Sequence, residues 1–315
     1  MVHNVEEEIA QAMEKSKKEF SKETLDKLTL LLKRVDEKCP PKPRVLLKPV
    51  RAENISVFDS KLGGVPYLPK EMEYPKVLEG SSAGKPLRLL AQLNFEKLPR
   101  LEGFPEKGIL QFFTGSDDDD VIGIDFDNYF NQNAFRVIYH KNITEDTSKL
   151  ISQADMPDFD CEEDYFPFKG EFLLTAGEVR NVPVTTADFR FDIVIAEAYN
   201  ELFGGNIVGM YGMRGEQGAA QVDRPLYDAV HEVRCQLGTC MGGFPFFMQE
   251  DPRCYNDDCA KCDILLFQLD SEIPEGGKFE DEIMWGDSGV GNFFISSEDL
   301  AKRDFTRVLY TWDCG

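Results

Sequence analysis

Three cysteines in the second half of the chain have a spacing that suits a metal site. Cys254 and Cys259 are separated by four residues, and Cys259 and Cys262 by two. Two thiolates separated by two residues can share one tetrahedral Zn²⁺, and Cys240 is the fourth ligand that we expect. A second closely spaced pair is missing, so buried free thiols are the alternative, and zinc is the one cofactor that the sequence suggests. Other residues that could complete the site are Cys235 and His231.

Carboxylates offer a second kind of chemistry. Asp270, Asp287 and Glu250 could supply the acid and the base of a hydrolase or another small-molecule enzyme. Their spacing selects no reaction, and the cysteines lack the accompanying histidines and glutamate of an open, catalytic metal site. Catalysis is therefore the alternative hypothesis, and no residue is assigned a catalytic role.

The sequence Gly286-Asp287-Ser288-Gly289 is similar to the nucleophile loop of trypsin-like serine proteases. That chemistry needs a histidine base within hydrogen-bond reach of the serine. The three histidines of the chain do not lie in the Ala-Ala-His-Cys context of those enzymes. We therefore exclude a protease and expect Asp287 and Ser288 to form a local turn, with Trp285 as a packing residue.

Four blocks in the first half of the chain recur in the second half in the same order. Their starts are offset by 179 residues (62 to 241), 176 (89 to 265), 181 (111 to 292) and 171 (136 to 307). Agreement in order and offset indicates two copies of one β-rich unit, although strands and turns of similar composition could also resemble one another. Each copy would bury an apolar face against the other, so we expect a binding cleft at their junction. The matched blocks are 62–68 and 241–247, 89–94 and 265–270, 111–113 and 292–294, and 136–139 and 307–310.

The matched blocks contain the residues that we expect at such a cleft. Each Gly-Gly-x-Pro sequence suits a tight bend, because glycine accepts a positive φ and proline fixes the φ beside it. Gln92 and Gln268 each interrupt an apolar strand, and a buried amide needs hydrogen-bond partners. Each amide either ties down the backbone of a neighbouring loop or faces a pocket. The expected binding residues are Gly63, Gly64, Pro66, Gln92, Gly243, Pro245, Gln268, Asp270, Trp285, Asp287 and Ser288.

Patterning divides the chain into four segments. Residues 1–41 are an N-terminal helical segment, and residues 42–143 are the first β-rich repeat. Residues 144–230 hold an acidic insertion, a helix and a glycine-rich loop, and residues 231–315 are the second repeat. The predicted fold class is α+β, mainly β: two duplicated β-rich halves packed pseudo-symmetrically in one domain, with an N-terminal helix.

Periodicity and helix-breaking residues predict individual elements within these segments. Apolar residues at helical spacing predict one helix over 4–37, and a short strand follows at 44–50. Acidic residues without periodicity indicate a surface loop over 144–168. A helix is predicted over 189–203, ending at two glycines, and a loop over 209–218, where glycine recurs every third residue.

The charge of the chain limits its partners. The 315 residues include 57 Asp and Glu against 35 Lys and Arg, a net charge of −22. Nucleic acids and anionic membranes would repel such a chain, whereas a basic protein would be attracted. A secretory signal and an apolar run of about 20 residues are both missing, so we expect a cytoplasmic protein whose eight cysteines stay reduced.

The matched blocks also resemble a known family. Residues 241–253 (MGGFPFFMQEDPR), 283–295 (IMWGDSGVGNFFI) and 307–313 (RVLYTWD) resemble the signature of the YwqG-like family, bacterial proteins catalogued as a domain of unknown function. The resemblance extends over almost the whole chain and implies a duplicated, mainly β fold. No catalytic residues are established for the family, so none is carried over. Further similar stretches are 61–69, 89–94 and 108–113.

The resemblance implies a non-catalytic function. The YwqG-like family is distantly similar to the eukaryotic programmed cell death protein 2 group, whose members are dedicated chaperones for a small-subunit ribosomal protein. Its bacterial members have also been suggested to take part in toxin–immunity systems. We therefore expect a protein-binding module, chaperone-like or immunity-type, whose acidic surface attracts a basic client. The cysteines at 254–262 depart from the family pattern, and a structural or metal-buffering role is the third hypothesis.

Overall fold

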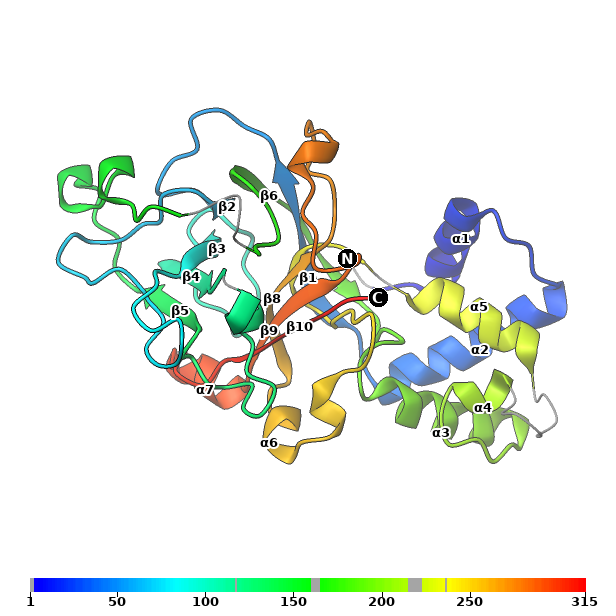
Figure 1. Cartoon of the computed structure of the whole chain (residues 1–315). Helices are drawn as coiled ribbons and strands as arrows, with labels where there is room; N and C mark the ends of the chain where they lie inside the picture. Colours follow the sequence, from blue (N-terminus) through cyan, green and yellow to red (C-terminus); the bar gives the residue numbers. More distant parts are fainter. Residues whose placement is uncertain (1–2, 117, 160–164, 215–222, 236) are drawn as a thin grey trace.

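Ten strands form one antiparallel sheet in this computed structural model, which describes residues 3–116, 118–159, 165–214, 223–235 and 237–315 (Figure 1). The strands are β1 Lys42–Val50, β2 Lys61–Gly63, β3 Arg88–Asn94, β4 Ile109–Thr114, β5 Phe135–His140, β6 Glu171–Val182, β7 Cys240–Gly242, β8 Ile264–Asp270, β9 Val290–Ile295 and β10 Leu309–Asp313. The predicted mainly β fold with helices is confirmed. The predicted strand at 44–50 lies within β1.

The order of the strands places the matched blocks symmetrically about the centre of the sheet. The order is β10-β9-β8-β7-β1-β6-β2-β3-β4-β5, so β1 and β6 separate a first arm, β2 to β5, from a second arm, β7 to β10. Both arms run outward in chain order. The register of β3 with β4 shifts between Leu89 and Ala91, and that of β8 with β9 between Leu265 and Phe267, which are matched positions.

Aromatic rings pack the two arms together. Phe112 of the first arm has its ring centre 5.3 Å from that of Phe267 and 4.6 Å from that of Phe293. Phe135 lies 5.1 Å from Tyr310 by the same measure. All five side chains are buried in one cluster. Apolar faces that each arm could not cover alone are thus buried against each other, and at these rings the arms meet through packed side chains instead of an open groove.

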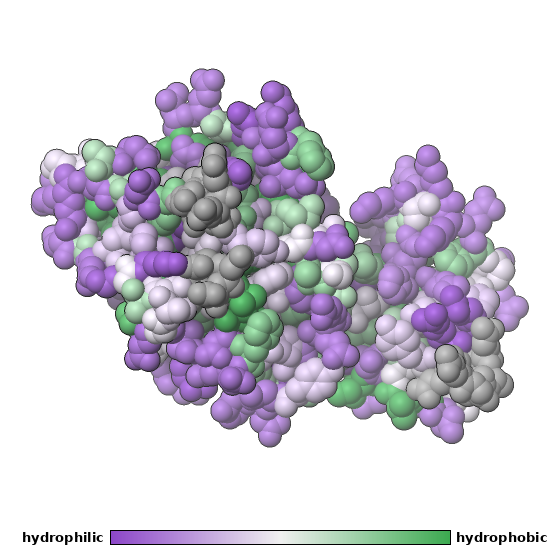
Figure 2. Space-filling model, viewed as in Figure 1, coloured by the Kyte–Doolittle hydropathy of each residue, from purple (hydrophilic) through white to green (hydrophobic). Residues whose placement is uncertain are grey.

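Five helices form a second apolar core beside the sheet (Figure 1). Their amphipathic faces bring together Leu28, Leu32, Ile195 and Val230, all fully buried. Figure 2 shows a notch between these helices and the β part, on a face that is mostly hydrophilic. The helices are α1 Val5–Ser16, α2 Lys22–Lys38, α3 Phe191–Phe203, α4 Tyr211–Arg214 and α5 Arg224–Arg234.

The prediction of one continuous helix over 4–37 is wrong, because the chain forms α1 and α2 there. Lys17 takes a left-handed conformation with φ 56°, and its N–H donates to Met13 O in a C-terminal cap. The hydroxyl of Ser21 then accepts from Thr24 N–H at 3.1 Å, which starts α2. Apolar periodicity continues across the break, so the pattern alone did not show it.

The segment 144–230 agrees with its predicted pattern in part. The helix predicted over 189–203 is α3, which ends at Gly204 with φ 70°. The acidic stretch contains two short 3-10 turns, Thr147–Lys149 and Gln153–Asp155, and its residues 160–164 lie outside the described ranges. In the predicted glycine-rich loop, residues 211–214 form α4 and residues 215–218 are again outside these ranges.

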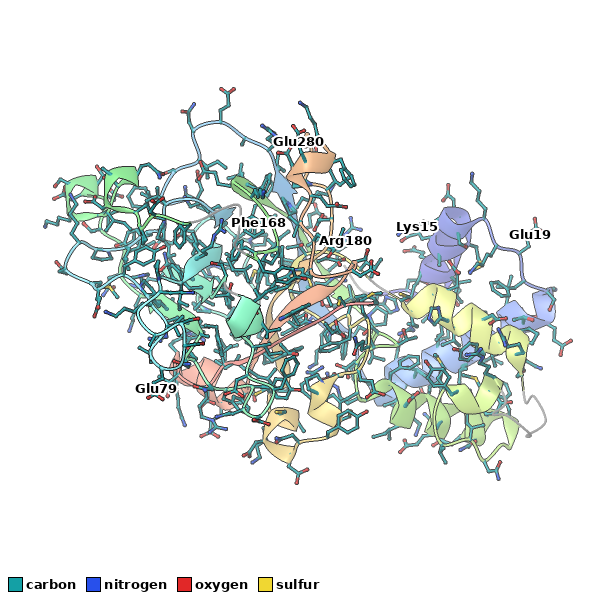
Figure 3. All side chains as sticks on the ribbon, viewed as in Figure 1. Lys15, Glu19, Glu79, Phe168, Arg180 and Glu280 are labelled. Atoms are coloured by element: carbon teal, nitrogen blue, oxygen red, sulfur yellow. The ribbon has the colours of Figure 1, made fainter. Side chains whose placement is uncertain are left out.

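Two further helices, α6 Asp257–Ala260 and α7 Ser297–Lys302, belong to the second arm. A cavity of about 870 Å³ separates α1 and α5 from the ends of β1 and β6, and Figure 3 labels Arg180 and Lys15 on its two sides. Among the helices of the described ranges, none combines the length and apolarity that crossing a membrane requires.

Candidate functional site

The two Gly-Gly turns have the backbone conformation that the sequence predicts. Gly63 and Gly64 have φ values of 63° and 69°, and Gly242 and Gly243 have 71° and 74°. A Cβ at Gly63 would lie 2.4 Å from Gly170 O, too close for any side chain. A Cβ at Gly64 would lie 2.0 Å from Glu171 Oε2. Glycine is therefore needed both for the turn and for close approach to β6.

The buried glutamines hold the loops that follow these turns. Gln92 accepts from Tyr67 N–H at 2.8 Å and donates to Val57 O and Asp59 O. Gln268 accepts from Phe246 N–H at 2.7 Å and donates to Gly238 O. Tyr67 and Phe246 occupy the same place after the two Gly-x-Pro sequences. The amides thus fix backbone, and neither lines the pocket described below.

The prolines and Thr185 belong to the same arrangement. Pro66 lies in the loop that Gln92 holds, and Pro245 accepts a hydrogen bond at its carbonyl oxygen from the Thr185 hydroxyl at 2.6 Å. The loop after each Gly-Gly turn is therefore fixed by buried polar contacts.

The other predicted binding residues lie in the second arm. Asp270, at the end of β8, accepts from Gly238 N–H at 2.6 Å and from Ser271 N–H at 2.9 Å, and burial raises the pKa of its carboxyl. Trp285 is fully buried, and its ring centre lies 5.9 Å from that of Trp312. Asp287 and Ser288 follow in the expected turn, where Ser288 has φ 55°.

The candidate carboxylates lie on separate segments. Asp270 ends β8, Asp287 is in the turn after Trp285, and Glu250 accepts from the hydroxyl of Tyr255 in the loop after β7. None of the three lines the pocket described below. Acid–base catalysis needs two such groups at one substrate, and the catalytic alternative stays a prediction.

The cysteines predicted to bind zinc lie in two environments. Cys240, Cys259 and Cys262 are buried, whereas Cys254 is exposed. Burial raises the pKa of Cys240 to about 11 and that of Cys262 to about 12, which favours the thiol over the thiolate that binds metals. Within the described part of the chain, no three His, Cys, Asp or Glu side chains converge as metal ligands. Zinc stays a prediction that metal analysis would test.

A buried network of charges ends the 241–253 motif. Arg253, which is 2 % exposed, donates to both oxygens of Asp251 and to Asp188 Oδ2 at 3.0 Å. Its guanidinium lies 4.1 Å from the ring centre of Phe294. Burial raises the pKa of Asp188, but Arg190 and Arg253 outweigh it and the pKa is lowered. The network joins the loop after β7 to the segment just before α3, so Arg253 ties the end of the motif to the helical part.

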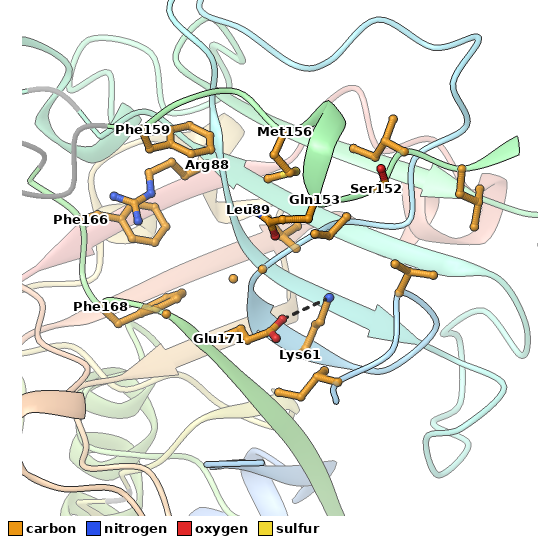
Figure 4. Close-up of a pocket in the computed structure, with 18 of the residues that line it drawn as sticks. Lys61, Arg88, Leu89, Ser152, Gln153, Met156, Phe159, Phe166, Phe168 and Glu171 are labelled. Atoms are coloured by element: carbon orange, nitrogen blue, oxygen red, sulfur yellow. Dashed lines mark ion pairs between the residues drawn. The ribbon is translucent and has the colours of Figure 1, made fainter. Parts of the chain in front are cut away.

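An open pocket of about 700 Å³ lies beside Gly63 and Gly64 (Figure 4). It is lined by residues within 55–65, by the start of β3, by residues within 147–159 and 166–170, and by the first residue of β6. Its walls are mostly apolar, so it can desolvate an apolar group. The side chains that form these walls include Leu89, Met156, Phe159, Phe166 and Phe168.

Two charged side chains lie together in this pocket. The Lys61 side chain is 1 % exposed, and its Nζ lies 3.7 Å from Oε2 of Glu171, which is 40 % exposed. Burial lowers the pKa of Lys61, against the opposing effect of Glu171 and Asp59. Arg88 borders the same space, with its guanidinium 4.3 Å from the ring centre of Phe166.

Sequence reasoning found part of this pocket and missed its charged residues. Gly63 and Gly64 were among the expected binding residues and line it. Lys61, Arg88 and Glu171 were not, because Arg88 and Glu171 lie far from Lys61 along the chain. A lysine in the otherwise apolar block 61–68 was the one local indication.

Comparison with known proteins places the chain in a family without assigning an activity. A search of curated proteins found no match. The family model described as "Domain of unknown function (DUF1963)" matches residues 60–314, which include both Gly-Gly turns, most residues that line the pocket and the Arg253 network. This match covers most of the chain. The protein therefore belongs to the family of the domain of unknown function DUF1963.

Proposed function

We propose that the protein is a non-catalytic protein-binding module that receives a segment of a client protein in the pocket beside Gly63 and Gly64. The composition of the pocket carries this proposal. Aromatic and aliphatic walls suit an apolar side chain, and buried aromatic contacts dominate the energy of protein recognition. Among the described residues that line it, Glu171 is the one carboxylate and there is no histidine or cysteine. This lining favours binding over acid–base chemistry.

The charge of the chain supports a basic client. With a net charge of −22, the protein attracts cationic segments from a distance, and added salt weakens that attraction. The preferred segment would carry an apolar residue next to lysines or arginines. A chaperone-like or an immunity-type role in the cytoplasm would use the same recognition. Membership of the YwqG-like family, supported by the residues of 241–253 and 283–295, belongs to the same proposal.

We also infer that the two arms arose by duplication of one β-rich unit. Three features support this inference: the symmetrical strand order, the matched register shifts and the matched loop contacts of Gln92 and Gln268. The arms then diverged, because the pocket lies at the Gly-Gly turn of the first arm.

A library of random 12-residue peptides displayed on phage would test the binding function. We expect selected peptides to share an aromatic or large aliphatic residue beside basic residues, and to bind more weakly as salt rises from 50 to 200 mM. Phe166→Ala should reduce binding of the selected peptides at least tenfold, because the ring forms a wall of the pocket. Phe279→Ala, at a ring that is 78 % exposed and outside the pocket, is the control. Selection of acidic peptides, or of none, would overturn the proposal.

A further inference from the structure

Lys61 is a buried cation with hydrogen-bonding capacity to spare. An ammonium carries three donors. The Lys61 side chain is 1 % exposed, and within the described residues its Nζ has one close anionic partner, Glu171, at 3.7 Å. That distance exceeds a hydrogen bond, and Lys61 lines the pocket, where a bound molecule can reach its ammonium. An oxygen acceptor from a bound molecule would therefore stabilise this site.

Glu171 restricts the kind of molecule that fits. The carboxylate and the ammonium together are neutral, so a charged ligand group would leave one charge unmatched. A neutral group that both accepts and donates satisfies the two side chains at once. Figure 4 shows the Lys61 and Glu171 side chains pointing toward each other at the pocket, with the rings of Phe166 and Phe168 on one side.

An extended peptide segment has such a pair of groups. In an extended chain the N–H and C=O of one residue point to the same side, as they do where antiparallel strands exchange two hydrogen bonds. We propose that Lys61 donates to the C=O, and Glu171 accepts from the N–H, of one residue of a bound extended peptide whose apolar side chain packs among Phe159, Phe166 and Phe168. This inference rests on the proposed protein-binding function. It names the main-chain groups of the bound peptide that the pocket recognises.

The second Gly-Gly turn supports this assignment by contrast. Cys240 stands at the position matched to Lys61, and Arg44 pairs with Gly242 as Glu171 pairs with Gly63. Phe244, at the position matched to the pocket residue Val65, is 1 % exposed and belongs to the helical core. The Lys61–Glu171 pair thus accompanies the open pocket and is not a requirement of the Gly-Gly turn.

Small amides of phenylalanine test the inference on the full-length protein. The first probe is N-acetyl-phenylalanine methylamide, which presents the N–H, the C=O and the ring. In the second probe an ester oxygen replaces the acetyl N–H, and the third is N-acetyl-phenylalanine with a free carboxylate. Binding is measured by NMR titration. We expect the amide to bind best, with a loss of about tenfold for the ester and a larger loss for the carboxylate.

Variants then assign the loss to each side chain. Lys61→Met should weaken binding of the amide probe by about tenfold or more. Glu171→Ala should weaken the amide but bind amide and ester equally, because the acceptor for the N–H is gone. Lys278→Met, at a side chain that is 76 % exposed, should change nothing. Equal binding of amide and ester to the unmodified protein, or tighter binding of the free carboxylate, would overturn the inference.

Two glycine variants separate an effect on the pocket from an effect on folding. Gly64→Ala places a Cβ where the Glu171 carboxylate lies, whereas Gly243→Ala imposes the same positive-φ strain in the second arm. Both variants should lower the midpoint of thermal unfolding, whereas only Gly64→Ala should weaken binding of the amide probe. If Lys61→Met binds the phage-selected peptides normally while Phe166→Ala does not, the Lys61–Glu171 inference fails and the binding function stands.

Discussion

At the scale of single residues, two buried cations have opposite consequences. Arg253 is surrounded by Asp251, Asp188 and the ring of Phe294, so its charge and its donors are satisfied inside the chain. Lys61 is equally buried, yet its anionic neighbour, Glu171, is beyond hydrogen-bond distance. A satisfied buried charge stabilises one packing arrangement, whereas an unsatisfied one is a candidate for binding.

We therefore expect Arg253 to stabilise the folded protein. Arg253→Met leaves the buried Asp251 without its ion-pair partner and the buried Asp188 with Arg190 alone, and we expect a loss of about 3–5 kcal/mol in the free energy of unfolding. Urea unfolding at pH 7 measures it. The control is Arg100→Met, at a side chain that is 77 % exposed, which should change the free energy by less than about 0.5 kcal/mol. Equal effects of the two substitutions would contradict the structural role.

The two matched glutamines allow a second comparison. Gln92→Leu leaves three backbone groups without their hydrogen-bond partner, namely Tyr67 N–H, Val57 O and Asp59 O. Gln268→Leu leaves two such groups, Phe246 N–H and Gly238 O. Each buried group without a hydrogen-bond partner lowers the free energy of unfolding by about 1–3 kcal/mol. Thermal unfolding should rank Gln92→Leu as the more destabilising variant. The reverse order would mean that the loop held by Gln92 rearranges and that its backbone groups form hydrogen bonds with water.

At the scale of elements, the sequence predicted what depends on neighbouring residues and missed what depends on distant ones. The Gly-Gly turns, β1 and α3 follow from local conformational preference. The pocket needed Glu171 beside Lys61, a contact between positions 110 residues apart (171 − 61) that no local pattern shows. The break between α1 and α2 was missed for a related reason, since the apolar stripe continues while the helices separate to pack against α5.

The start of α1 should respond to pH. Burial lowers the pKa of His3, but the carboxylates of Asp36 and Glu8, each 3.2 Å from Nε2, outweigh it and raise the pKa from 6.5 to about 9. A pKa raised on folding means that protonated His3 stabilises the fold fully below about pH 6.5, and that this stabilisation is lost as pH rises through about 9. Arg234, which also pairs with Asp36 and Glu8, stays charged throughout.

Unfolding experiments between pH 6 and pH 10 measure this effect. The unmodified protein should be more stable than His3→Gln at pH 6, and the difference should shrink as pH approaches 10. Protection of the α1 amides, corrected for the intrinsic pH dependence of exchange, should fall over the same range in the unmodified protein but not in His3→Gln. A constant difference between the two proteins would show that folding does not raise the pKa of His3.

At the scale of the whole molecule, the repeated blocks were enough to anticipate equivalent places for the strands but not how the arms meet. The matched residues made β2 equivalent to β7 and β4 equivalent to β9. In the sheet, the two strands of each pair lie at equal distances from the central strands β1 and β6. The expected cleft at the junction depended on side-chain volume, and Phe112, Phe267 and Phe293 pack together there. The open pocket lies instead where β2 and β3 of the first arm adjoin β6, and its lining residues within 147–159 and 166–168 fall outside the matched blocks.

Rings shared between the arms should make them unfold as one unit. Trp285 and Trp312 both lie in the second arm, so tryptophan fluorescence reports that arm. Phe113 is buried on the outer face of the first arm, against Tyr74. Phe113→Ala should cost about 3–5 kcal/mol, and in a cooperative molecule it lowers the fluorescence-detected midpoint in urea.

The matched substitution in the second arm is the reference for this measurement. Phe294 occupies the position that corresponds to Phe113 and is also buried, so Phe294→Ala must shift the fluorescence transition directly. If the rings of Phe112 and Phe293 couple the arms, both substitutions shift the midpoint by similar amounts. A fluorescence transition that Phe113→Ala leaves unchanged, while circular dichroism shows an earlier loss of strands, would mean that each arm folds independently of the other.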